Sequence, residues 1–387
     1  MRVRFLRVDP VGLFLIALAA LAALVVLAAP ACRAATDSGR HPESRAPAEP
    51  TRAPATPAAP FPRWIPGDLH MHVAPPDHAD VVLDVAGVAR AARAAGLGFV
   101  ILTPHLDATA WNAPRQRPRW LAAWAQMAQA ARAEPGVTLV PGVEYSEDGV
   151  GHFGVSGVDP AQLGDGRFLD AAAHAGAFVV VNHPFAVPTH IPGVPASNRD
   201  FSYRPWSAPP TASGPIDPLA AVEIWNARLA LANLVSRPGG QTAEERSLAA
   251  ADLDARTHRR HLALVGGTDN HSLLVIPTTW VLAAGPSERD LLAALSAGAT
   301  CVGGPEAGSL EAHGDGDAAD APWVGIGGSV RARRAVDLRF AGRARVFVDG
   351  VDEGEHDASF HAAVDGAPHT FRVVVGPSRS GFVYANF

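Results

Sequence analysis

Short, almost continuously apolar runs alternate with longer alanine-rich stretches between residues 64 and 305. The apolar runs predict strands at 68–73, 99–104, 138–145, 178–182, 221–225, 262–268 and 278–283. The alanine-rich stretches predict helices near 84–95, 117–133, 167–175, 241–259 and 287–297. Apolar strands that alternate with helices are typical of a parallel sheet covered by helices, so we expect an α/β fold. Six or seven such units favour a barrel.

The pattern changes on both sides of this region. Residues 33–63 are rich in Pro, Ala, Ser, Thr and Arg and predict a flexible linker, because this composition cannot form a packed core. After residue 305, Gly- and Asp-rich turns separate alternating segments such as 336–342 and 369–376, which predicts a small antiparallel β appendage over 306–387. Within the α/β region, residues 186–217 predict a long Pro- and Ser-rich loop, a kind of segment that is often functional.

The first 32 residues predict an export segment. Arg2, Arg4 and Arg7 precede an apolar run over 11–29, and Cys32 follows small residues. Three interpretations stay open: lipid attachment at Cys32, cleavage with plain secretion, or an uncleaved membrane helix. All three place the rest of the chain outside the cytoplasm, and a lipid anchor in a bacterial cell envelope is favoured. The membrane is therefore an expected partner, through the lipid or the helix.

Composition and charge exclude several functions. The 387 residues are sufficient for a large core, and the net charge of −6 without a basic patch gives no reason to expect a nucleic-acid partner. All 32 basic residues are Arg, so neither a Schiff-base lysine nor the lysine of a phosphate-binding loop is possible. The GxSxG pattern of a serine hydrolase is also absent from the sequence.

Metal-ligand side chains follow five of the predicted strands at their carboxyl ends. His70 and His72 are one residue apart on the first strand, so both rings point to the same side. The other ends carry His105, Glu144 with His152 shortly after, His183, and Asp269 with His271. A single histidine at a strand end is usually a core or capping residue, but the carboxyl ends of barrel strands meet at one mouth. The joint pattern therefore predicts a metal site of imidazole and carboxylate ligands.

These motifs also carry a family resemblance. GDLHMH, LTPH, PGVEYS, GHF, NHP and GTDNH occur in the order and approximate spacing of the PHP family, the polymerase-and-histidinol-phosphatase metallohydrolases. The Glu-Ile-Trp-Asn run at 223–226 and the β-rich C-terminal region resemble the carbaryl-hydrolase-like branch. The resemblance covers residues 64–305 and implies a distorted (β/α)₇ barrel that holds two or three divalent ions of Zn, Mn or Fe.

The resemblance further implies three sets of ligands. The first ion is expected at His70, His72, Glu144 and Asp269, with Glu144 bridging to a second ion at His152 and His183. A third ion is expected at His105 and His271 together with a residue of the turn at 75–78, where Asp77 and His78 both fit and His78 is preferred. Pro104 stands where the family usually has Asp, which is a departure next to the third ion.

Two ions that share a hydroxide would favour hydrolysis, with Glu144, Asp269 and His271 as the expected catalytic residues. Arg115 is a candidate contact for a phosphate, or else a solvated helix start; Trp225 and Asn226 are candidates for the pocket wall, or else core residues. We expect a metal-dependent phosphoesterase that acts on a small, phosphorylated molecule. The alternatives are a carboxylic ester or carbamate hydrolase on the same site, and a non-catalytic metal- or ligand-binding lipoprotein.

Overall fold

The computed structural model describes residues 62–78, 81–186, 201–207, 219–230, 241–271 and 275–387. All of them fall in one compact unit of the chain. The predicted export segment over 1–32, nearly all of the predicted linker over 33–63 and most of the predicted loop over 186–217 lie outside the described residues. Among the helices in the described ranges, none has the length and apolar character needed to cross a membrane.

The sheet begins with parallel strands. β1 (Arg63–Met71) pairs in parallel with β2 (Phe99–Leu102), and β2 and β3 (His105–Asp107) both pair in parallel with β4 (Thr138–Glu147). The register places His105 directly opposite Glu144. A second parallel set consists of β6 (Phe178–Asn182), β7 (Ala221–Asn226) and β8 (Ala263–Gly267).

The expectation of a uniformly parallel sheet is wrong at two strands. β5 (Gly151–Ser156) is antiparallel to β4 and β6, and β9 (Thr279–Ala283) is antiparallel to β1. β5 follows β4 after a three-residue turn, and so short a connection can only return the chain antiparallel. The end of β8 returns to β1 through one isolated bridge, between Met71 and Asn270. The fold is therefore mixed α/β with parallel strands, and the hydrogen bonds do not confirm a seven-unit barrel.

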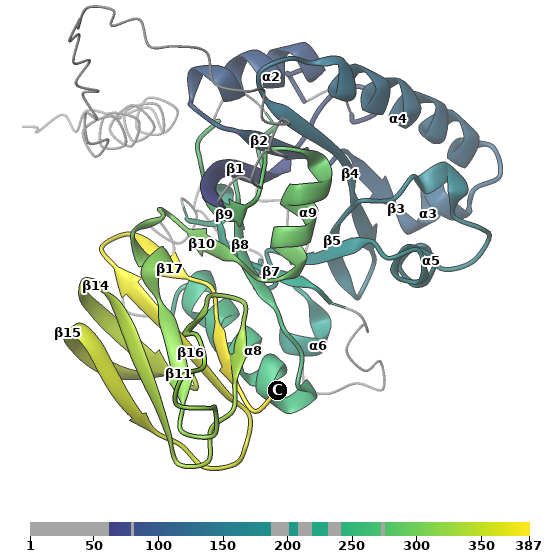
Figure 1. Cartoon of the computed structure of the whole chain (residues 1–387). Coiled ribbons are helices and arrows are strands. Elements are labelled where there is room, and N and C mark those ends of the chain that lie inside the picture. Colours follow the sequence, from purple (N-terminus) through teal and green to yellow (C-terminus); the bar gives the residue numbers. More distant parts are fainter. Residues whose placement is uncertain (1–61, 79–80, 187–200, 208–218, 231–240, 272–274) are drawn as a thin grey trace, which may run out of the picture. The chain divides into compact units, whose positions relative to one another are not determined.

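The five helices that the sequence predicts lie close to their expected positions, and the described residues form further short helices that were not predicted. They are α2 (Val85–Ala94), α3 (Ala108–Asn112), α4 (Gln116–Ala133), α5 (Phe168–His174), the short α6 (Arg204–Ser207), α8 (Ala243–His258) and α9 (Glu288–Ser296), with single-turn 3₁₀ helices η1 (Pro160–Gln162) and η2 (Glu306–Ser309). Side-chain caps explain the starts: Asp84 accepts from the Gly87 amide before α2, and Thr242 forms a capping box with Glu245 before α8. Figure 1 shows α2 and α4 side by side along the strands of the first parallel set.

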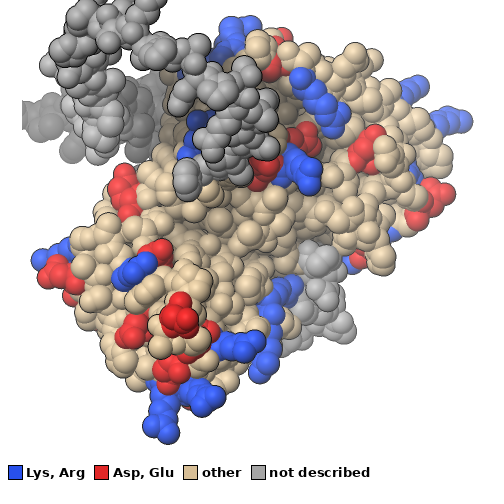
Figure 2. All heavy atoms as spheres, viewed as in Figure 1, with Lys and Arg blue, Asp and Glu red and all other residues tan. Residues whose placement is uncertain are grey.

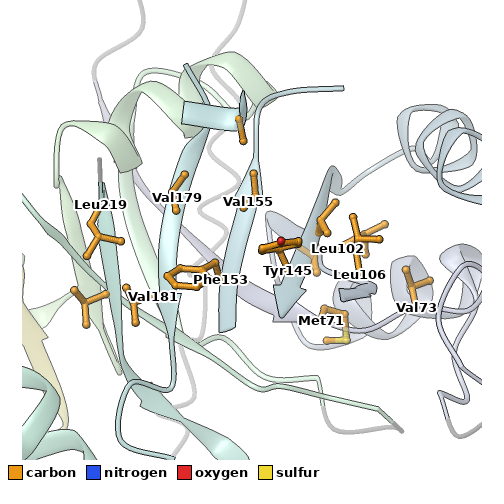
Figure 3. Close-up of a cluster of buried hydrophobic side chains, with 14 of the residues drawn as sticks. Met71, Val73, Leu102, Leu106, Tyr145, Phe153, Val155, Val179, Val181 and Leu219 are labelled. Atoms are coloured by element: carbon orange, nitrogen blue, oxygen red, sulfur yellow. The ribbon is translucent and has the colours of Figure 1, made fainter. Parts of the chain in front are cut away.

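The main core lies between these helices and the strands. Met71, Leu102, Tyr145, Phe153 and Val181 are at most 1% exposed, and they project from successive strands into the cluster drawn in Figure 3. Burial of a large apolar side chain stabilises the fold by about 1.5–3 kcal/mol each. This packing holds the strands rigidly, so that the side chains at their carboxyl ends are fixed in position.

The C-terminal region is antiparallel, as predicted, but its strands differ in detail. Its strands are β10 (Thr300–Val302), β11 (Glu311–Gly314), β12 (Val324–Gly325), β13 (Ser329–Val330), β14 (Ala335–Val348), β15 (Val351–Ala363), β16 (His369–Val375), β17 (Ser378–Ser380) and β18 (Val383–Ala385). β14 contains the predicted segment 336–342 and pairs antiparallel with β11, β15 and β16, whereas β13 and β18, which both lie in the fully described range 275–387, pair in parallel. β15 was not predicted because it is polar and mostly exposed along its length.

Charges are mixed over the surface. Acidic and basic side chains are interspersed on the face drawn in Figure 2, without a continuous region of one sign. The expected absence of a nucleic-acid partner stays a prediction. The C-terminal region contacts the α/β region through specific polar groups, among them the buried Tyr384 hydroxyl, which donates to the Leu262 carbonyl (3.0 Å) and accepts from the Leu262 amide (2.8 Å).

Candidate metal centre

The carboxylate of Glu144, at the end of β4, lies at the centre of the predicted ligands. Its Oε1 atom is 3.1 Å from His70 Nε2, 3.2 Å from His183 Nε2 and 3.3 Å from His152 Nδ1. The Asn182 side chain donates to the same oxygen at 3.0 Å. We call His70, His152 and His183 the inner half of the centre. The rings of His70 and His183 are almost fully buried.

The other oxygen of Glu144 faces a second group of imidazoles. Oε2 is 3.2 Å from His105 Nε2 and 3.5 Å from His72 Nε2. The His271 ring lies 4.0 Å from that of His72, and the His78 ring stacks on His105 at 4.6 Å. We call His72, His78, His105 and His271 the outer half. Three of its members are more exposed than His70 and His183, with the His271 side chain 16%, the His105 side chain 26% and the His78 side chain 51% exposed, whereas the His72 side chain is fully buried.

Asp269 joins the two halves from the end of β8. Its Oδ1 atom is 3.3 Å from His72 Nε2 and 3.9 Å from His70 Nε2. A positive φ of 51° turns the backbone at Asp269, where its amide donates to the His70 carbonyl. Four groups of side chains have donor atoms within 4.8 Å of one another: His70–Glu144–His183, His70–His72–Asp269, His72–His105–His271 and Asp77–His78–His105.

Asp77 holds two rings of the outer half from behind. Its Oδ2 atom accepts from His72 Nδ1 at 2.8 Å and its Oδ1 atom accepts from His105 Nδ1 at 2.9 Å. These bonds fix the tautomers, because each ring then turns Nε2 toward Glu144. The sequence left Asp77 and His78 as alternative ligands for a third ion; the structure places Asp77 buried behind two imidazoles and His78 at the exposed edge.

Glu223 supports the inner half in the way that Asp77 supports the outer half. The predicted site did not include Glu223. Its Oε1 atom lies 3.1 Å from His70 Nδ1, and its Oε2 atom accepts from the His183 amide at 2.7 Å. The Asn226 side chain donates to Oε2 at 3.1 Å and to Asp269 Oδ2 at 3.4 Å. A signal for Glu223 was present, because a carboxylate inside the apolar strand β7 requires a donor or a cation beside it.

Asp68, which the prediction also omitted, connects β1 to the segment that follows β8. It accepts from the His70 amide at 3.1 Å, from the Thr268 amide at 3.0 Å and from the Thr268 hydroxyl at 2.5 Å. Burial raises the pKa of Asp68 to about 6 despite these bonds. The bonds set the positions of His70 and of the segment that carries Asp269.

The carboxylates of the centre favour positive charge beside them. Burial lowers the pKa of His70, but the nearby carboxylates of Glu144, Glu223 and Asp269 outweigh it and raise that pKa well above its usual value. The pKa values of His72 and His183 are raised for the same reasons. Burial raises the pKa of Glu144, yet the surrounding histidines hold it well below its usual range. Divalent cations satisfy such a cluster in place of protons.

A cavity of about 870 Å³ opens onto the centre. Ligand-type residues of both halves line it, together with Leu106, Trp120, Phe201, Arg204 and Arg228. Among the predicted substrate contacts, Arg115 is exposed at the residue before α4, and Trp225 packs against the main core; neither lines this cavity. Arg228 was not predicted, because its position depends on the turn that follows β7.

The donor set fits divalent metal ions. It contains only imidazole nitrogens and carboxylate oxygens, which suit Zn, Mn or Fe, and the cysteine of the described part, Cys301, is buried outside the centre. The buried Nδ1 atom of His183 has no hydrogen-bond partner among the described residues. Several groups of residues are therefore arranged so that they could hold divalent ions.

Comparisons with known proteins add little to this geometry. No family model and no curated protein matches the chain. A two-domain protein from Bacteroides vulgatus that contains a predicted PHP-like metal-dependent phosphoesterase aligns with 87% of this chain and 99% of its own, at 14% identity and a TM-score of 0.42. PsfC from Pseudomonas syringae aligns with 57% of this chain and 81% of its own, at 17% identity and a TM-score of 0.33. Similarity at these levels supports no argument about function, so the candidate centre is argued from its own residues.

Proposed function

We propose that this chain is a metal-dependent phosphoesterase with a PHP-like site. The observation that carries the proposal is the position of Glu144, whose two carboxylate oxygens face two different sets of imidazoles at 3.1–3.5 Å. A carboxylate in this position is arranged to bridge two cations. The motif resemblance favours phosphoesters as substrates and a distorted (β/α)₇ arrangement of the strands.

The residues then have separate tasks. The inner half and the outer half would each hold an ion, with Glu144 and Asp269 shared between them. Bound ions would supply Lewis acidity and lower the pKa of a water molecule between them. Burial and the nearby His72 lower the pKa of His271 to about 4, so its ring stays neutral and available as a ligand. Asp77 and Glu223 orient the imidazoles, and the cavity receives the substrate.

Ester or carbamate hydrolysis on the same centre is the second candidate. Leu106, Trp120 and Phe201 give the cavity an apolar wall that would accept an uncharged organic substrate. A non-catalytic metal-binding protein is a third candidate. One experiment distinguishes the second and third candidates from phosphoester hydrolysis.

The experiment uses protein purified without chelator and assayed for metal content. Zn²⁺, Mn²⁺ or Fe²⁺ is then added back to protein stripped of metal, and turnover of p-nitrophenyl phosphate, bis-p-nitrophenyl phosphate, naphthyl acetate and carbaryl is measured. We expect chelator-sensitive hydrolysis of a phosphoester. Turnover of only the neutral esters or the carbamate would replace the phosphoesterase proposal with the second candidate, and stoichiometric metal binding without any turnover would favour the third.

Export through residues 1–32 and lipid anchoring at Cys32 belong to the same proposal. We expect the full chain to fractionate with membranes in its bacterial host and Cys32→Ser to be released from them. A Cys32→Ser variant that stays in the membrane fraction would favour an uncleaved helix instead.

A further inference from the structure

Arg228 lies at the junction of the cavity and the proposed metal centre. It follows β7 by two residues, and the turn there is fixed because the Asn226 side-chain oxygen accepts from the amides of Arg228 (3.0 Å) and Leu229 (3.2 Å). Asn226 in turn donates to Glu223 and Asp269. The backbone of Arg228 is therefore tied to the same residues that build the centre.

One nitrogen of the Arg228 guanidinium contacts the centre directly. Nη1 donates to Asp269 Oδ1 at 3.4 Å and lies 3.0 Å from His271 Nδ1. The side chain is 59% exposed and lines the cavity. Within the described residues, its Nε and Nη2 atoms make no hydrogen bond, so most of its donors remain for a molecule in the cavity.

The geometry points to Arg228 as the residue that binds the phosphate of the substrate, an assignment that rests on the proposed phosphoesterase function. A guanidinium fork matches two oxygens of a phosphate and is charged at every physiological pH. Its position beside Asp269 and His271 brings these donors to the edge of the centre, where the non-reacting oxygens of a phosphoester would lie. A neutral ester or carbamate has no anionic oxygen for this charge, so Arg228 would select phosphoesters over both.

A simpler explanation is that Arg228 only neutralises the negative charge of Asp269. An ion pair with an arginine this exposed contributes little to stability, and if Arg228 had no other role, its removal would leave phosphate binding unchanged. The two explanations therefore differ in a measurable way.

The test compares Arg228→Ala and Arg228→Lys with Arg90→Ala, an exposed arginine on α2 outside the cavity. Metal content is measured first, and binding of inorganic phosphate to the metal-loaded proteins is then followed by calorimetry. We expect Arg228→Ala to weaken phosphate binding by at least about tenfold with metal content unchanged, Arg228→Lys to recover part of the loss, and Arg90→Ala to match the wild type. The KM for p-nitrophenyl phosphate should rise in parallel, whereas binding of naphthyl acetate should change less than about twofold.

Phosphate affinity within twofold of the wild type in Arg228→Ala would overturn the assignment, as would loss of metal from that variant, because the residue would then serve the centre itself.

Failure of the proposed function would give different results. If the wild type binds phosphate through Arg228 but hydrolyses no phosphoester, the anion site stands and the phosphoesterase proposal falls. If it hydrolyses phosphoesters equally well with and without Arg228, the phosphoesterase proposal stands and the anion site falls. If the wild type neither binds phosphate nor hydrolyses a phosphoester, both proposals fall.

Discussion

The inner and outer halves of the candidate metal centre share Glu144 and Asp269 but differ in the support of their rings and, at most positions, in exposure. In the inner half, His70 and His183 are almost fully buried while His152 reaches the cavity, and the half is held by Glu223 and Asn182. In the outer half, His78, His105 and His271 border the cavity while His72 is buried, and a single carboxylate, Asp77, orients the rings of His72 and His105. Buried, well-oriented ligands lose little freedom when an ion binds, whereas exposed ones exchange with water. We infer that the inner half is the tight site and the outer half the one where substrate and ions exchange.

Glu144→Gln provides the largest test, because it changes the carboxylate whose two oxygens face both halves. An amide is neutral, and its nitrogen is a donor that repels a cation. We expect kcat/KM for a phosphoester to fall by on the order of 10³-fold and metal content to drop in both halves. Circular dichroism should show an unchanged fold, because the core of Figure 3 lies outside the centre. Full turnover by this variant would remove the basis for a shared carboxylate.

The next test separates the halves by their supporting carboxylates. Glu223→Gln should weaken the inner ion and Asp77→Asn the outer one, each by about 10–100-fold, because neither residue need touch an ion. Chelator competition monitored by metal analysis gives the two affinities. Glu245→Gln, on the exposed capping box of α8, is a matched control that changes an equally small group outside the centre. If both centre variants weakened the same ion, the division into halves would be wrong.

The clustering of the candidate ligands could be predicted from the sequence because it depends on strand ends. His70, Glu144, His183 and Asp269 each end or follow an apolar run, and the topology brings such ends together whatever the details of pairing. The helix positions were predicted well for a similar reason, since alanine-rich segments with side-chain caps are local features.

The supporting residues could not be predicted in the same way. The role of Glu223 depends on hydrogen bonds to residues 40 and 153 positions away, and that of Asp77 on a turn that returns beneath two rings. The direction of β5 depends on a three-residue turn, and β15 has no apolar alternation to reveal it. These features arise from tertiary geometry, which a single sequence records only indirectly.

A pH comparison tests whether protons and metal ions compete for the inner half. In the metal-free protein, carboxylates outweigh burial and raise the pKa of His70 and His183 above 6.5. The stability from these protons is fully present below pH 6.5 and is lost as pH rises through the raised pKa values. Metal ions require the neutral rings. The increase in melting temperature on adding Zn²⁺ should therefore be several degrees larger at pH 8 than at pH 6, and equal increases would contradict the competition.

His78→Ala should have the smallest effect and defines the outer limit of the centre. The His78 ring stacks on His105 at 4.6 Å but is half exposed. Its Nδ1 atom lies beyond hydrogen-bonding distance of Asp77 Oδ1. If His78 is a ligand of a third ion, as the sequence predicts, its removal should cost one equivalent of weakly bound metal and about three- to tenfold in kcat/KM, while the two ions around Glu144 remain. Metal stoichiometry at increasing chelator concentration measures this directly. In this variant Asp77 would still hold His72 and His105. Loss of all bound metal from His78→Ala would therefore contradict the view that the exposure of the ligands distinguishes the outer half from the inner one.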